Sequence, residues 1–194
     1  MLVLAIVEEL KELDTRLFLL VNGAHTPLLD VCMHYVSHKF FWIPFYLFLL
    51  YLLFKNYGTK TTLLALVFTG LVIAVSDQVC LHLFKNVFLR YRPCHNALLQ
   101  HKIHLVDACG GMYGFVSSHA ANTFALAFFL FHLLKERYKW SSLLFVWAAF
   151  VSYSRVYLAQ HYPADVAVGA LVGLLAALLI SKLYFYTASK LEHV

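Results

Sequence analysis

Long apolar runs separated by short polar segments dominate this chain of 194 residues. Five runs stand out, at residues 40–54, 61–84, 118–134, 140–157 and 165–186. A helix needs about 20 residues to cross the hydrocarbon core of a bilayer, with a working range near 17–25. The second and fifth runs have the full length, and the other three lie at or below the lower limit. The pattern predicts an all-α fold, a polytopic membrane helix bundle of five to six transmembrane helices.

Composition supports the same class. The chain is 62% hydrophobic and 13% charged, whereas soluble globular chains have roughly 45–50% apolar and about 25% charged residues. A single domain of this length cannot bury such a surplus of apolar side chains. We therefore expect one integral membrane domain over residues 1–194. The net charge of +5 comes from basic residues in loops between apolar runs, which indicates contact with bilayer headgroups and no nucleic acid partner.

The polar segments divide into two groups. Residues 1–39 mix acidic and basic side chains with Leu, Ile, Val and Phe, which predicts amphipathic helices that lie in the membrane interface or pack on the bundle. Residues 85–117 form the one long polar loop. Short loops at Lys55, Lys60 and residues 135–139 are basic and fall on the opposite side. The positive-inside rule favours placing these short loops in the cytoplasm and the 85–117 loop outside.

Three polar stretches then fall on that outer side, because alternate crossings return the chain to the same face. They are residues 85–93, 114–119 and 154–165. From these stretches we select three cations, two imidazoles, one carboxylate and two hydroxyls: Lys85, Arg92, Arg155, His119, His161, Asp165, Ser117 and Ser118. Lys and Arg side chains bind phosphate oxygens. The two serines fall where a helix should begin, and a helix N-terminus also favours an anion.

The histidines give this set its chemistry. A neutral imidazole can attack phosphorus, and a second imidazole can protonate the leaving oxygen. His161 and Asp165 are four residues apart, so a helix opened by Asp165 would bring its carboxylate near the ring. That carboxylate would hold the tautomer and stabilise the developing positive charge. The sequence therefore predicts His161 as nucleophile, Asp165 as its orienting group and His119 as general acid.

These stretches resemble the tripartite signature of the type 2 phosphatidic acid phosphatase superfamily. The resemblance rests on Lys85-x6-Arg92-Pro93, then Ser117-Ser118-His119, then Ser154-Arg155-x5-His161-x3-Asp165, and spans residues 77–173. The second part departs from the usual Pro-Ser-Gly-His. The resemblance implies a phosphatase that uses no metal or cofactor and forms a phosphohistidine. Lys85, Arg92 and Arg155 would hold the phosphate oxygens, and the Ser117 hydroxyl with neighbouring backbone N–H groups would complete the pocket.

Several substrates fit such a resemblance. Among bacterial members of the superfamily, undecaprenyl diphosphate phosphatases rank first, followed by lipid A phosphatases and phosphatidylglycerophosphate phosphatases. We expect a bacterial inner membrane protein whose site faces the periplasm or exterior. A carrier or scramblase of lipid phosphates is the non-enzymatic alternative, and it needs the cations but no paired His161 and Asp165.

Two cysteines, Cys94 and Cys109, lie in the outer loop. A disulfide is permitted if this loop is periplasmic. It would stabilise the loop by about 3 kcal/mol in the chain-entropy model.

Overall fold

The structure is a computed structural model that describes residues 2–191. Its helices are α1 (Leu2–Gly23), α2 (Pro27–Ser37), α3 (Ile43–Val79), α4 (Asn86–Phe88), α5 (Ser118–Leu134), α6 (Leu143–Tyr157) and α7 (Pro163–Leu191). Shorter elements are the 3-10 turns η1 (Lys39–Trp42), η3 (Pro93–His95) and η4 (Lys139–Ser142) and the π-helical segment η2 (Cys80–Lys85). Residues 2–191 contain no β-strand, which confirms the all-α prediction.

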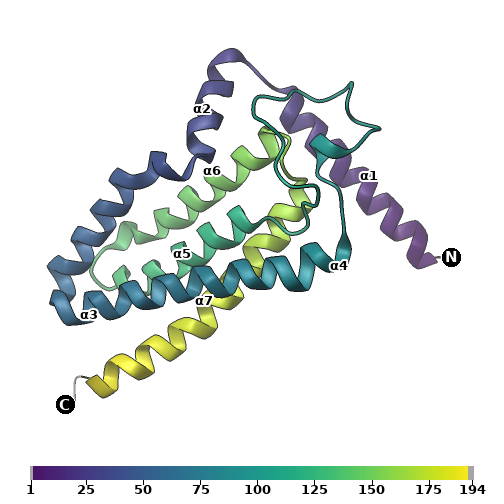
Figure 1. The fold of residues 1–194 in the computed structure, drawn as a ribbon. Coiled ribbons are helices and arrows are strands. Elements are labelled where there is room, and N and C mark those ends of the chain that lie inside the picture. The colour runs from purple at the N-terminus through teal and green to yellow at the C-terminus, as the bar shows by residue number, and fades with distance from the viewer. Residues whose placement is uncertain (1, 192–194) are drawn as a thin grey trace.

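The first two predicted runs fold into one hairpin. α3 reverses direction at Gly58, whose φ of 68° lies in the left-handed region that glycine adopts most readily. Figure 1 shows the chain doubling back at this point before it continues through η2 to α4. The second arm of the hairpin therefore carries Lys85 to the same end of the bundle as the loop that follows.

Within residues 2–191, two helical segments are long and apolar enough to cross a membrane, Lys39–Phe88 and Pro163–Lys190. The first includes both arms of the hairpin, and α5 is a shorter apolar helix of 17 residues. Leu171, Leu175 and Leu179, spaced one turn apart on α7, are all exposed, as expected for a face that contacts lipid. The predicted count of five to six transmembrane helices goes beyond these two segments and stays a prediction.

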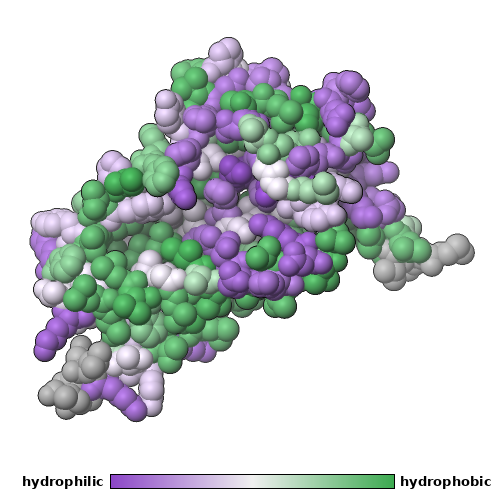
Figure 2. Space-filling model, in the orientation of Figure 1, coloured by the Kyte–Doolittle hydropathy of each residue, from purple (hydrophilic) through white to green (hydrophobic). Residues whose placement is uncertain are grey.

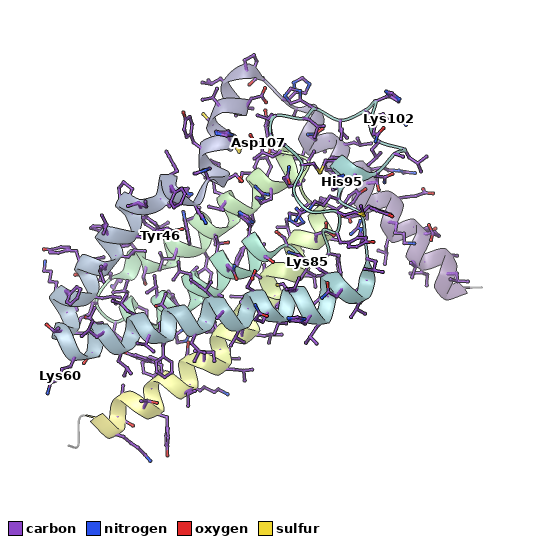
Figure 3. The ribbon with its side chains drawn as sticks, viewed as in Figure 1. Tyr46, Lys60, Lys85, His95, Lys102 and Asp107 are labelled. Carbon is purple, nitrogen blue, oxygen red and sulfur yellow. A yellow bond between two sulfur atoms is a disulfide. The ribbon has the colours of Figure 1, made fainter. Side chains whose placement is uncertain are left out.

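Polar and apolar surfaces separate along the molecule. In Figure 2, hydrophobic side chains cover much of the middle of the bundle, and hydrophilic side chains gather over α2 and the loop between α4 and α5. Figure 3 places Lys60 at the hairpin end and Lys102 in the loop at the opposite end. This separation agrees with the sequence-based grouping of short basic loops on one side and residues 85–117 on the other.

α5 lies at the centre of the bundle, packed against α3, α6 and α7. Two glycines let α7 approach α5 closely. A Cβ atom at Gly173 would lie 2.0 Å from the Ala121 carbonyl oxygen, and one at Gly169 would lie 2.6 Å from that of Ser117. Small residues four apart allow such contact between membrane helices. The N-terminal ends of α5 and α7 are thereby held against each other.

α1 packs on the bundle by one face and leaves the other exposed. Phe18 and Asn22 are buried, while Leu13 and Leu20 are exposed. The Asn22 amide donates to the carbonyls of Tyr157 (2.7 Å) and His104 (2.8 Å). Since a buried amide is costly without partners, these bonds anchor the C-terminal end of α1 to α6 and to the outer loop.

The outer loop is ordered by covalent and backbone contacts. Cys94 and Cys109 form a disulfide, the pairing that the sequence left open. An isolated antiparallel bridge joins Tyr91 to Tyr113. The Arg92 backbone N–H donates to the Met112 carbonyl at 3.1 Å. The segment around Arg92 is therefore held extended at the bundle end.

Candidate active site

The centre of the site is a buried histidine beside a buried carboxylate. His161 lies between α6 and α7 and is 1% exposed, and Asp165 lies in the first turn of α7 and is 0% exposed. One Asp165 oxygen, Oδ2, is 3.5 Å from His161 Nδ1 and accepts a hydrogen bond from the Tyr162 backbone N–H at 3.0 Å. The four-residue spacing therefore places the carboxylate beside the ring.

Arg92 defines the other edge of the His161 ring. Its Nη1 lies 2.9 Å from His161 Nε2. Because a guanidinium only donates hydrogen bonds, Nε2 accepts, and the ring proton sits on Nδ1 facing Asp165. Burial, followed by the positive charges of Arg92, Arg155 and Lys85, lowers the pKa of His161 well below its usual range. The ring is therefore neutral near pH 7, with a lone pair on Nε2 directed at the cations.

Three cations converge from three elements. Arg92 is fixed by donating from Nε to the Gly111 carbonyl (2.6 Å) and from Nη1 to the Gln160 carbonyl (3.0 Å). Arg155, in the last turn of α6, donates from Nη1 to the Ser37 hydroxyl of α2. Its buried Nε has no hydrogen-bond partner within residues 2–191. Arg155 thus retains a donor that an anion could take up.

The third cation contacts the start of α5. Lys85 Nζ donates to the Ser118 hydroxyl at 2.7 Å. Ser117 is the N-cap, its buried hydroxyl accepting from the Ala120 N–H at 3.4 Å, and its own N–H bonds to the Asp165 carbonyl at 2.9 Å. In this structure the Ser117 hydroxyl caps α5, whereas the sequence-based expectation placed it among the groups that surround phosphate.

His119 completes the set in the first turn of α5. The residue is exposed, and its ring lies within electrostatic range of His161 and of the three cations Lys85, Arg92 and Arg155. All eight residues selected from the sequence therefore gather at one end of the bundle. An exposed imidazole beside a buried one fits an acid that meets water and a nucleophile that does not.

Sequence reasoning missed two residues that contact the Asp165 carboxylate directly or through one partner. Arg90 Nη1 donates to Asp165 Oδ1 at 2.7 Å, and Arg90 Nη2 donates to Asp14 Oδ2 at 2.6 Å. Arg90 could have been found from the Arg-Tyr-Arg alternation, because residues two apart in an extended segment point the same way. Asp14, one of several acids in an amphipathic helix, gave no signal.

A second omission is Gly114. A Cβ atom there would lie 3.1 Å from Arg92 Cγ, 3.2 Å from Asp165 Oδ2 and 3.5 Å from His161 Nδ1. The absence of a side chain lets the loop backbone close over the dyad. This tight contact helps to exclude water from the His161 and Asp165 side chains.

Possible metal ligands lie elsewhere. In the described part of the chain, the atoms of Cys94, His95 and Cys109 fall within 4.8 Å of one another. The two sulfurs are joined in the disulfide, so they are not available as thiolates. Inside the site, His161 lies beside one carboxylate, Asp165, and within range of the cations Arg92, Arg155 and Lys85, which repel a metal ion.

A cavity of about 750 Å³ lies beside the site, on the Arg90 side. α1 lines it with Val7 and Leu10, and Phe88, Phe115 and Tyr162 line it opposite. The wall is thus largely apolar and reaches Arg90 at the edge of the dyad.

Similarities to known proteins agree with this geometry. A lipid A 4'-phosphatase of Bacteroides thetaiotaomicron is 39% identical over 86% of this chain and 75% of its own length. An undecaprenyl-diphosphatase of Sulfolobus acidocaldarius is 30% identical over 82% of this chain and 73% of its own length. The crystal structure of Aquifex aeolicus LpxE superposes with a TM-score of 0.58 and 29% identity, covering 88% of this chain and 95% of that one.

The family itself is shown by a direct match. The model of the PAP2 superfamily matches residues 61–189, which extend from the second arm of α3 to α7 and include every site residue selected from the sequence. The resemblance seen in the three motifs is thereby confirmed. The chain belongs to the PAP2 superfamily, whose phosphatases hydrolyse phosphate esters.

Proposed function

We propose that this protein removes a phosphate group from lipid A or a closely similar lipid, with His161 as the nucleophile. The observation that carries the chemistry is the position of His161: its Nε2 lies 2.9 Å from Arg92 Nη1, and its Nδ1 lies 3.5 Å from Asp165 Oδ2. The choice of lipid rests on the 39% identity to a lipid A 4'-phosphatase, against 30% for the undecaprenyl-diphosphatase. This reverses the order of substrates that the sequence alone favoured.

The first step forms a phosphohistidine. Lys85, Arg92 and Arg155 bind the non-bridging oxygens and neutralise the charge that builds up in the transition state. His161 Nε2 attacks phosphorus, the P–O ester bond breaks, and His119 gives a proton to the departing lipid oxygen. Asp165 stabilises the imidazolium through Nδ1. In this step Arg92 must move its hydrogen bond from Nε2 to the phosphate.

The second step releases phosphate. A water molecule gives its proton to His119 and attacks phosphorus, and the P–N bond breaks. His161 returns to its neutral form and His119 is again protonated. The two histidines therefore need different exposure to solvent. His119 must contact the attacking water molecule, whereas His161 must attack phosphorus without competition from water. The burial of His161 and the exposure of His119 support these two roles, nucleophile and acid–base group.

The membrane setting follows from the same argument. The apolar cavity that Val7, Leu10 and Phe88 line could hold acyl chains, while the headgroup phosphate reaches the cations. We place the protein in a bacterial inner membrane, with the site at the periplasmic or exterior face. The basic hairpin residues Lys55 and Lys60 support a cytoplasmic location for the opposite end.

The test measures phosphate release in detergent from lipid A, undecaprenyl diphosphate, phosphatidylglycerophosphate and phosphatidate, with a chelator present. We expect lipid A to be hydrolysed fastest and the chelator to have no effect. His161→Ala should abolish release, while His132→Ala, at the far end of α5, should not change it. Full release by His161→Ala would refute the mechanism, and a faster rate with undecaprenyl diphosphate would refute the choice of lipid.

A carrier of lipid phosphates remains the alternative from another class. It would bind these lipids through Lys85, Arg92 and Arg155 and release no phosphate. Rapid quenching in alkaline detergent with ³²P-labelled lipid separates the two functions, because a phosphohistidine survives alkali and is hydrolysed in acid. An enzyme of this kind leaves label on the protein that is stable in alkali, and the label should be missing from His161→Ala.

A further inference from the structure

The Arg-Tyr-Arg segment places a guanidinium on each side of the His161–Asp165 dyad. Arg92 contacts His161 Nε2, and Arg90 contacts Asp165 Oδ1. The bridge between Tyr91 and Tyr113 keeps this segment extended, with the Gly114 N–H donating to the Arg90 carbonyl at 2.8 Å. The two arginines can therefore reach the same dyad from one short extended segment.

Arg90 is unsuited to hold substrate phosphate. Both of its terminal nitrogens are engaged, one by Asp165 and the other by Asp14. Its guanidinium also stacks over the Tyr162 ring, 4.1 Å from the centroid. A planar donor held by two carboxylates and a ring face has a fixed orientation. Its effect on the reaction must pass through the carboxylate that it holds.

Asp14 extends this contact to α1. Its second oxygen accepts from the Ala164 backbone N–H at 2.8 Å, one residue before Asp165. The residue is 7% exposed, so its carboxylate relies on these two donors for hydrogen bonds. Asp14 lies outside residues 61–189, the part that the superfamily model matches. The family match therefore does not account for it.

We propose that Arg90 and Asp14 are positioning residues that hold the Asp165 carboxylate against His161, and that α1 is thereby part of the active site. The inference rests on the proposed phosphohistidine chemistry. Arg90 fixes Oδ1 and leaves Oδ2 turned toward Nδ1, 3.5 Å away. Asp14 in turn fixes Arg90 and the backbone at Ala164. Loss of either contact frees a buried carboxylate to rotate or to take up a proton.

The test is a double-mutant cycle between Arg90 and Asp165. Arg90→Gln, Asp165→Asn and the double variant are compared for kcat and KM on the panel lipid that the wild-type protein hydrolyses fastest. Arg90→Gln should lower kcat by about thirtyfold or more, since loss of a histidine-orienting contact acts on the transition state. KM should change less than about threefold. In the Asp165→Asn background the same substitution should cost less than about threefold.

Matched variants separate positioning from folding. Arg16→Gln removes an exposed arginine of α1 that pairs with Glu12 and should leave kcat unchanged. Arg90→Lys, which keeps the positive charge, should recover part of the kcat that Arg90→Gln loses. Asp14→Asn should lower kcat by about five- to tenfold, given that it acts one contact further away. If Arg90→Gln does not fold, Arg90→Lys and Asp14→Asn carry the same cycle with Asp165→Asn.

Two results would overturn the inference. One is a wild-type kcat in Arg90→Gln and Asp14→Asn. The other is an equal loss from Arg90→Gln in both Asp165 backgrounds, which would mean that Arg90 acts independently of the carboxylate. Failure of the proposed function is separate, because it would appear as full phosphate release by His161→Ala.

Discussion

Replacing Gly173 by alanine tests whether contact between α5 and α7 holds the site together. The added Cβ would lie 2.0 Å from the Ala121 carbonyl oxygen, and ordinary contact begins near 3.4 Å. The helices must therefore separate by about 1.4 Å, because the opposing atom is backbone and cannot rotate away. Such overpacking costs about 1–3 kcal/mol. A displacement of about 1 Å at reacting groups can cost on the order of a hundredfold in rate.

The assay pairs thermal unfolding in detergent with phosphate release. Gly70→Ala is the matched control, since a Cβ at this position of α3 meets nothing within 4 Å. We expect Gly173→Ala to melt several degrees lower and to lose at least about tenfold in kcat, with Gly70→Ala unchanged or slightly more stable. A Gly173→Ala protein with wild-type melting temperature and kcat would refute the reasoning, and so would an equal loss in Gly70→Ala.

Three further predictions follow from single contacts. The pKa of His161 is lowered in the folded protein. As pH falls, the His161 ring is therefore protonated in the unfolded chain, near the ordinary pKa of about 6.5, before it is protonated in the folded protein. The contribution of neutral His161 to the stability of the fold is complete above about pH 7 and decreases as pH falls below about 6.5. The melting temperature of the wild type should therefore drop more between pH 7.5 and 5.5 than that of His161→Gln. Reduction of the Cys94–Cys109 disulfide should destabilise the protein by about 3 kcal/mol in denaturant unfolding, whereas a Cys94→Ser/Cys109→Ser protein should not respond to reductant; equal response of both would contradict the assignment. Ser37→Ala removes the hydroxyl that Arg155 donates to and should raise KM on the order of tenfold through loss of a charged hydrogen bond; an unchanged KM would show that Arg155 needs no support from α2.

The local elements of the site could be predicted because their signals are local. Ser117 precedes an apolar run, and α5 begins directly after it, at Ser118. Asp165 follows Pro163 in the first turn of α7, so its reach to His161 depends only on helix geometry. The disulfide joins two cysteines of one loop that lie 15 residues apart. In each case one short segment contains the whole reason for the structure.

The role of the Ser117 hydroxyl was not predictable in the same way. A serine at a helix start can cap the helix or face a ligand, and the two uses require the same residue at the same position. Close packing of α7 against α5 at Gly169 buries Ser117. That burial directs its hydroxyl to the Ala120 N–H, and the neighbouring Ser118 meets Lys85 instead.

The sequence alone predicted the membrane class, the three polar motifs and the face that they share. These predictions depend on the length of the hydrophobic runs and on the order of the motifs, neither of which requires knowledge of packing. Only the tertiary structure could decide that Arg90 and Asp14 support Asp165, that Ser37 holds Arg155, and that α1 contributes to the dyad. These contacts join residues separated by 75 to 150 positions. At such separations in sequence, the partner of a side chain depends on which helices pack together and on their relative shift along the bundle axis. The spacing of residues along the chain does not contain that information.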